Sequence, residues 1–73
     1  MDRQTFIDNM MERGYELRFV RNGNITATKG ENTVRLVPLA DYIVYVDTPT
    51  ATALTRKDAT DAETMDIIAA LTD

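Results

Sequence analysis

The 73-residue chain lacks cysteine, histidine, serine and tryptophan. Without Cys, neither disulfides nor thiolate metal sites can form. Without His, the commonest metal ligand and the side chain that ordinarily titrates near neutrality are missing. Nucleophilic sites of the Ser–His or Cys–His kind are excluded for the same reason. We therefore expect a non-enzymatic protein that binds no cofactor and no metal.

Long hydrophobic runs are also absent. No stretch approaches the roughly 20 apolar residues that a membrane helix needs. The first residues show no basic region followed by an apolar run, the pattern of a secretion signal. Lack of Cys is typical of a reducing compartment. We expect one soluble, cytoplasmic domain over residues 1–73, small enough that a partner subunit is a usual remedy for its limited core.

Charge is unevenly spread along the chain, whose net charge is −4. Residues 1–37 carry six basic and five acidic side chains, whereas residues 38–73 carry two basic and seven acidic ones. Such an asymmetry bears on the electric field of the protein and on its partners rather than on its fold.

One segment is apolar on both faces of an extended strand: Tyr42, Ile43, Val44, Tyr45 and Val46. Strands of this composition are buried on two sides. A short link from the preceding strand favours an antiparallel neighbour, since a parallel one needs a long crossover. The rest of the fold has to cover this strand.

The residues before this strand predict a helix and an antiparallel meander. Asp2 is placed to cap a helix over residues 3–13, which ends at Gly14. A three-residue turn at residues 21–23 keeps the apolar residues of two strands on one face, pairing Phe19 with Ile25. A turn at residues 30–31 leads to a third strand over residues 32–37. The predicted core face consists of Leu17, Phe19, Ile25, Ala27, Val34 and Leu36.

The residues after it are less regular. Residues 48–59 are compatible with a loop, a short fifth strand or one helical turn, and their threonine content favours extended structure. Thr60 and Glu63 match a capping box, which predicts a helix over residues 61–72. The expected fold class is α+β: an N-terminal helix, an antiparallel meander of four or five strands, and a C-terminal helix.

The strand at residues 42–46 would be an aggregation hazard if it lay uncovered at the sheet edge. Three covers remain open: a fifth strand from residues 50–56, the C-terminal helix lying over one face, or the same strand of a second copy. The last would make a homodimer with a continuous sheet.

The missing catalytic side chains and the acidic second half favour a protein-interaction module. Small acidic chains of this kind are common among phage and mobile-element accessory proteins, some of which inhibit host defence. An acidic row ending at Asp73 would act against a nucleic-acid-binding machine as a phosphate-like surface. The expected partner-binding residues are Tyr42, Tyr45, Asp47, Asp58, Asp61, Glu63 and Asp66.

A nucleic-acid-binding domain is the alternative hypothesis. Basic side chains on the solvent side of the sheet and at its turns would contact phosphates, and such binding would weaken steeply with salt. The residues expected to carry it are Arg18, Arg21, Lys29 and Arg35.

Overall fold

A computed structural model describes the backbone of residues 1–39 and 42–73, and the side chains of all of these except Tyr42 and Ile43. The elements in chain order are α1 (Arg3–Glu12), β1 (Glu16–Phe19), the short 3-10 helix η1 (Arg21–Gly23), β2 (Ile25–Lys29), β3 (Asn32–Leu36), β4 (Tyr42–Asp47), β5 (Thr52–Arg56) and α2 (Asp61–Thr72). The predicted α+β class is confirmed.

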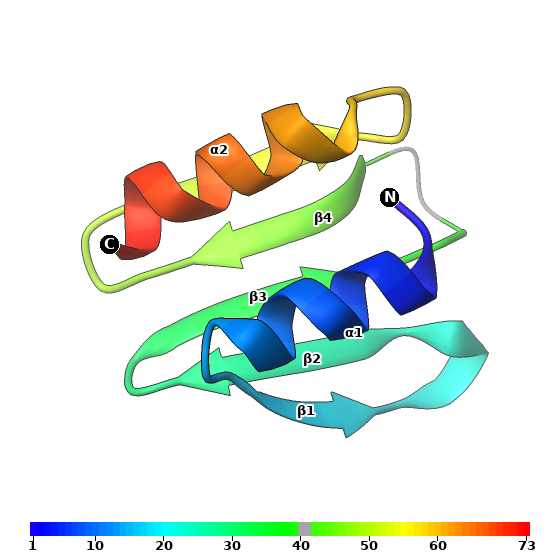
Figure 1. Cartoon of the computed structure of the whole chain (residues 1–73), viewed down its shortest axis with the longest axis horizontal. Helices are drawn as coiled ribbons and strands as arrows, with labels where there is room; N and C mark the ends of the chain where they lie inside the picture. Colours follow the sequence, from blue (N-terminus) through cyan, green and yellow to red (C-terminus); the bar gives the residue numbers. More distant parts are fainter. Residues whose placement is uncertain (40–41) are drawn as a thin grey trace.

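The strands form one antiparallel sheet in the order β1-β2-β3-β4-β5, and both helices lie on the same face of it (Figure 1). In this view α1 lies over the β1–β3 side of the sheet, and α2 packs on β4 and β5. The two helices run in the same direction, so both C-termini lie at the end of the molecule that holds the β2–β3 turn.

Turn chemistry sets the register as the sequence predicts. The loop at η1 places Phe19 opposite Ile25, with Gly23 at a φ of 76° and Asn22 also left-handed at a φ of 61°. The next turn pairs Ala27 with Val34, so the apolar residues of neighbouring strands stay on one face.

Both predicted helix starts are present. The Asp2 carboxylate accepts a hydrogen bond from the Thr5 N–H at 2.8 Å. Thr60 and Glu63 form the predicted capping box at the start of α2. A helix of 12 residues depends on docking for its stability, and α2 docks through the buried side chains of Thr64 and Ile68.

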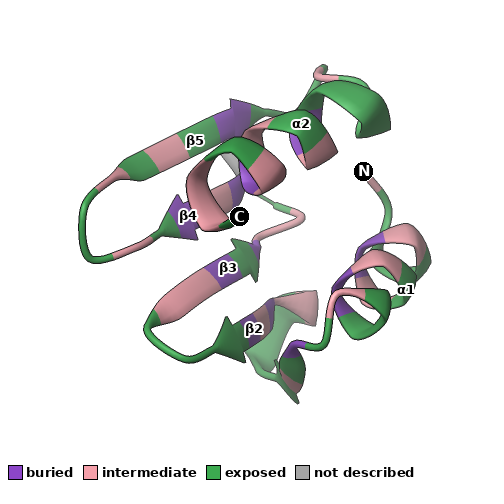
Figure 2. Cartoon of the chain, turned by 60° about the vertical axis from the view of Figure 1, so that its left-hand side comes forward, coloured by how far each residue is buried: buried purple, intermediate pink, exposed green. Residues whose placement is uncertain are grey.

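The core lies between the helices and the sheet (Figure 2). Leu17 of the predicted core is only half-buried, and Phe19 is 58% exposed, because β1 is the edge strand of the sheet that the described residues form. The buried hydrophobic residues are Phe6, Met10, Tyr15, Ile25, Ala27, Val34, Leu36, Val44, Val46 and Ile68.

β5 pairs with β4, the strand whose apolar sequence would favour aggregation if its edge were uncovered. It pairs with β4 from Thr52 opposite Asp47 to Arg56 opposite Tyr42. β4 also pairs with β3 on its other side, so its backbone is used on both edges. A continuous sheet across a homodimer would therefore have to form at β1 or β5 instead of at Tyr42–Val46.

Candidate functional site

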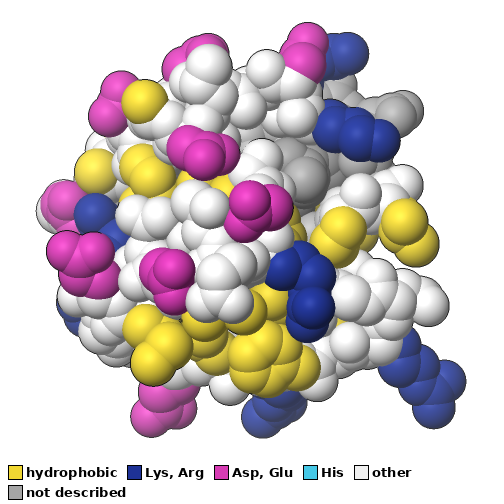
Figure 3. All heavy atoms as spheres, turned by 45° about the vertical axis from the view of Figure 1, so that its right-hand side comes forward, with side chains coloured by type: hydrophobic (Ala, Val, Ile, Leu, Met, Phe, Trp, Pro, Cys, Tyr) yellow, Lys and Arg dark blue, Asp and Glu magenta, His cyan; other side chains and the backbone are white. Residues whose placement is uncertain are grey.

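The helices and their capping residues carry most of the negative charge. We call this set, residues 2–13 and 60–73, the helix layer. It holds two basic side chains, Arg3 and Arg13, against seven acidic ones. All seven are exposed, and the face shown in Figure 3 bears acidic side chains over much of its upper left part. The acidic residues are Asp2, Asp8, Glu12, Asp61, Glu63, Asp66 and Asp73.

The α2 part of this layer contains acidic residues and no basic one. Asp73 forms an ion pair with Arg13 at 2.6 Å, and Asp61 lies 3.6 Å from the N-terminal amino group of Met1. Glu63 serves the capping box. Within the described residues, Asp66 forms no ion pair, so its charge is directed to solvent.

At the start of α1, the Asp2 carboxylate caps the helix. Hydrogen bonds from the backbone N–H and the side chain of Thr5 hold the pKa of its carboxyl below the ordinary value. Both favour the ionised form, as does the positive end of the helix dipole. Asp2 is thus part of the fold as well as of the acidic layer.

The sheet face away from the helices is open. Alternation along the strands places two cross-strand rows on it. The first row runs across all five strands as Arg18, Thr26, Arg35, Tyr45 and Leu54. Neither helix covers this face. The second row runs as Glu16, Thr28, Thr33, Asp47 and Thr52.

The first row combines positive charge with an aromatic ring. The Arg35 guanidinium carbon lies 5.2 Å from the centroid of the Tyr45 ring, which is within the range of a cation–π contact. Leu54 beside Tyr45 is 47% exposed. The row therefore offers two guanidinium groups, an aromatic ring and an exposed leucine, with the carboxylates of Glu16 and Asp47 in the next row.

The expected partner-binding residues are split between the two sides of the sheet. Asp61, Glu63 and Asp66 lie on α2, whereas Tyr45 and Asp47 lie on the open sheet face. Asp58 lies in the β5–α2 loop, 3.8 Å from Arg56. The Tyr42 side chain lies outside the described residues. One flat surface cannot contact all of them at once.

The alternative nucleic-acid-binding set is divided as well. Arg18 and Arg35 flank Thr26 on the open face, and Arg21 lies in η1 at the end of the sheet. Lys29 shares the parity of the buried Ile25 and Ala27 and so faces the helix side. There its amino group donates to the Arg13 carbonyl at 2.8 Å. Two of the four residues are thus brought together.

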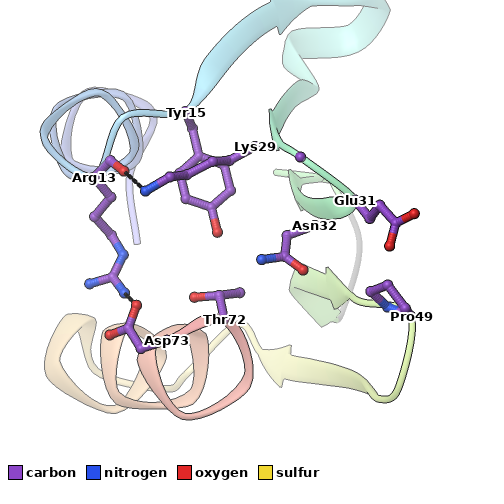
Figure 4. A pocket seen from close by; sticks show the side chains of 9 residues that line it. Arg13, Tyr15, Lys29, Glu31, Asn32, Pro49, Thr72 and Asp73 are labelled. Carbon is purple, nitrogen blue, oxygen red and sulfur yellow. Dashed lines mark hydrogen bonds and ion pairs between the residues drawn. The ribbon is translucent and has the colours of Figure 1, made fainter.

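A pocket of about 590 Å³ lies between the C-terminal ends of the helices and the β2–β3 turn (Figure 4). Lys29 passes over the Tyr15 ring at 5.9 Å, and Arg13 is paired with Asp73, so both cations already have partners. The described residues contain no cluster that could hold a metal ion. We assign no ligand to this pocket.

Sequence reasoning missed two parts of these surfaces. Asp8 and Glu12 join the acidic layer, and their i, i+4 spacing on the predicted helix is a signal for a shared face. Leu54 lies within residues 48–59, whose sequence is compatible with loop, strand or helical turn and so does not assign this side chain to a face. The Arg35–Tyr45 contact requires the register of β3 against β4, which no turn motif fixes.

Neither helix has the length and hydrophobicity of a membrane span, within the part of the chain that the structure describes. No protein-family model matches the chain, and no curated protein or solved structure is significantly similar to it.

Proposed function

We propose that the protein is a non-enzymatic interaction module that docks its acidic helix layer onto a basic surface of a protein partner. The observation that carries this proposal is the composition of α2 with its caps: four acidic side chains, all exposed, and no Lys or Arg. A surface of one sign selects a partner of the other sign, because like charges opposed across an interface are strongly unfavourable.

The layout of these charges supports a nucleic-acid-binding protein as the partner. With a rise of about 1.5 Å per residue, the segment from Glu63 to Asp73 spans about 15 Å along one helix. Asp8 and Glu12 add charges from α1 on the same side of the sheet. A groove that binds a phosphate backbone would meet a comparable row of anions. On this proposal the protein acts as an inhibitor, of the kind carried by phage or mobile elements.

Displacement of DNA tests the proposal directly. The basic proteins of a cell lysate are collected on heparin, eluted, and bound to a fluorescent 20-base-pair duplex. Fluorescence anisotropy of the duplex is then followed as the 73-residue protein is added. We expect release of the duplex, weaker at higher salt because exposed charges are screened. Asp66→Lys should raise the concentration needed for release about tenfold, since it reverses a charge at the contact.

Glu31→Lys is the matched control. It changes the net charge by the same amount but lies in the β2–β3 turn, and it should leave displacement unchanged. Failure of the unmodified protein to release DNA at low and moderate salt would refute the proposal. Equal effects of the two substitutions would show that net charge, rather than the helix layer, is responsible.

A single-stranded nucleic acid on the open sheet face is the second candidate function. The observation in its favour is the row that holds Arg18, Arg35 and Tyr45, since guanidinium groups bind phosphates and aromatic rings stack on bases. The acidic helix layer on the opposite side and the carboxylates of Glu16 and Asp47 act against it.

The salt dependence of binding separates this candidate from the first. Two phosphate contacts predict a slope of about −1.4 in log affinity against log salt for a single strand, and Arg35→Ala should bring it to about −0.7. Lys29→Ala is the control, because Lys29 lies on the helix side, and it should change neither affinity nor slope. No anisotropy change with a labelled 12-nucleotide strand at low salt would exclude this function.

A further inference from the structure

The outer edge of β1 has backbone groups that no other strand of the described residues uses. The Val20 N–H donates to the Asn24 carbonyl at 2.9 Å, so the backbone hydrogen-bonding groups of Val20 point toward the β2 side of the strand. Along a β-strand, the backbone N–H and C=O groups of successive residues point alternately to one side of the strand and to the other. Glu16 and Arg18 therefore also direct their N–H and C=O groups to β2, whereas Leu17 and Phe19 direct theirs away from the sheet.

Apolar side chains accompany this free edge. Phe19 is 58% exposed, and Leu17 beside it is half-buried. On α1, Met11 is 62% exposed, and Ile7 is half-buried one turn before it. Hydrophobic side chains gather along the lower margin of Figure 3, at the level of α1 and β1. An apolar patch beside unpaired backbone groups is the kind of edge that native proteins cover.

We propose that a second copy of this chain covers it, by pairing β1 with β1 around a two-fold axis at Leu17. Leu17 would then exchange both backbone hydrogen bonds with Leu17 of the second copy. The charges agree with this register, because Glu16 falls opposite Arg18 of the other copy, and Arg18 opposite its Glu16. A two-fold contact has to be complementary to itself, and these two residues make it so.

Competing registers at the same edge are less favourable. An axis at Arg18 would oppose two arginines directly, and like charges in a cross-strand pair are destabilising. An axis at Tyr15 fails because its N–H already donates to the Met10 carbonyl at 2.9 Å. The Leu17 register leaves the Tyr15 carbonyl as an acceptor for the Phe19 N–H of the second copy.

The other edge of the sheet is less suited to a second copy. β5 presents the small side chains of Ala53 and Thr55 on its helix side, and Thr55 is already buried. α2 lies directly over β4 and β5. A two-fold contact at β5 would bring two such acidic helices toward each other, with no basic residue on either helix to offset the repulsion.

A charge swap tests the interface and its register. Sedimentation equilibrium should give a dimer of the 8.2-kDa chain at micromolar to submillimolar concentrations. Glu16→Arg and Arg18→Glu should each weaken dimerisation at least about tenfold, because each turns two attractive pairs into repulsive ones. The double variant E16R/R18E keeps the original net charge and should restore the dimer. Circular dichroism of each variant checks that the fold is retained.

Crosslinking gives a second, independent readout. Because the chain has no Cys, Leu17→Cys creates a single thiol. Directly opposed residues of a hydrogen-bonded pair lie about 5.5 Å apart at Cα, within the roughly 4.4–6.8 Å that a disulfide spans. We expect a covalent dimer on mild oxidation, and none from the control Leu54→Cys on β5.

A monomer at all concentrations up to about 0.3 mM would overturn the proposal, because the dimer Kd would then lie in the millimolar range or above. Failure of the double variant E16R/R18E to restore the dimer would also overturn the proposal. That result is expected of the Arg18 register, in which the double variant places two glutamates opposite each other. Crosslinking through Leu54→Cys instead of Leu17→Cys would place the contact at the β5 edge.

Discussion

Replacing Ile68 by alanine should remove the fully buried apolar side chain with which α2 packs on the sheet. Ile68 is fully buried, and the only other buried residue of α2 is Thr64. Deleting the buried methyl and methylene groups of an isoleucine costs about 2–5 kcal/mol, depending on how far the surroundings collapse. A domain of this length has a total free energy of unfolding of about 4–11 kcal/mol. The substitution should therefore remove a large fraction of the stability.

Urea unfolding followed by circular dichroism measures this effect, with the midpoint falling and the slope of the transition unchanged if α2 still folds with the rest. Ile67→Ala is the matched control, because the neighbouring isoleucine is half-buried. It should cost about 1–2 kcal/mol, since less apolar area leaves water. A larger loss for Ile67→Ala than for Ile68→Ala would refute the docking geometry of α2 and, with it, the orientation of the acidic side chains.

Three further predictions concern the ends of elements. Thr60→Ala should lower the free energy of unfolding by about 1 kcal/mol in the same urea assay, because the capping box loses its hydroxyl. The Asp2 carboxyl has a lowered pKa in the folded state. Its stabilising contribution is therefore present above its unfolded-state pKa of about 4 and is lost as pH falls through its folded-state pKa. Asp2→Asn should remove this part of the acid dependence of stability, measured by urea unfolding at several pH values. Gly23→Ala should destabilise by about 1–2 kcal/mol because of its left-handed backbone, whereas Asn22→Gly should be nearly neutral, as thermal melts will show.

Local chemistry was sufficient to predict much of the fold. The parity of apolar residues across the turn at Gly23 selects one register out of two, and the structure has that register. Thr60 and Glu63 fix the start of α2 for a similarly local reason. Each of these features depends on residues within a few positions of one another, so no knowledge of tertiary packing is needed to find it.

Properties that depend on distant segments could not be predicted in the same way. Residues 52–56 become a strand because β4 offers an unpaired edge, and their own pattern did not distinguish strand from loop. Phe19 alternates like a core residue, yet it is exposed because β1 is at the edge of the described sheet. The acidic helix layer is likewise not apparent from the charges of the two halves of the chain, because α1 and α2 come from opposite ends of the sequence and share one face of the sheet.

This layering gives the proposed dimer a functional consequence. A two-fold axis normal to the sheet keeps the helices of both copies on the same side, so pairing at β1 would join two acidic helix layers into one wider surface. The same pairing would engage Arg18 with Glu16 of the second copy and so reduce the positive charge of the open sheet face. Dimerisation therefore favours a basic partner on the helix side over a nucleic acid on the sheet side. If the two proposals hold together, disrupting the Glu16–Arg18 contact should weaken DNA displacement even though Asp66 and the rest of the helix layer are unchanged. The reason is that a monomer presents one acidic helix layer to the partner, whereas the dimer presents two.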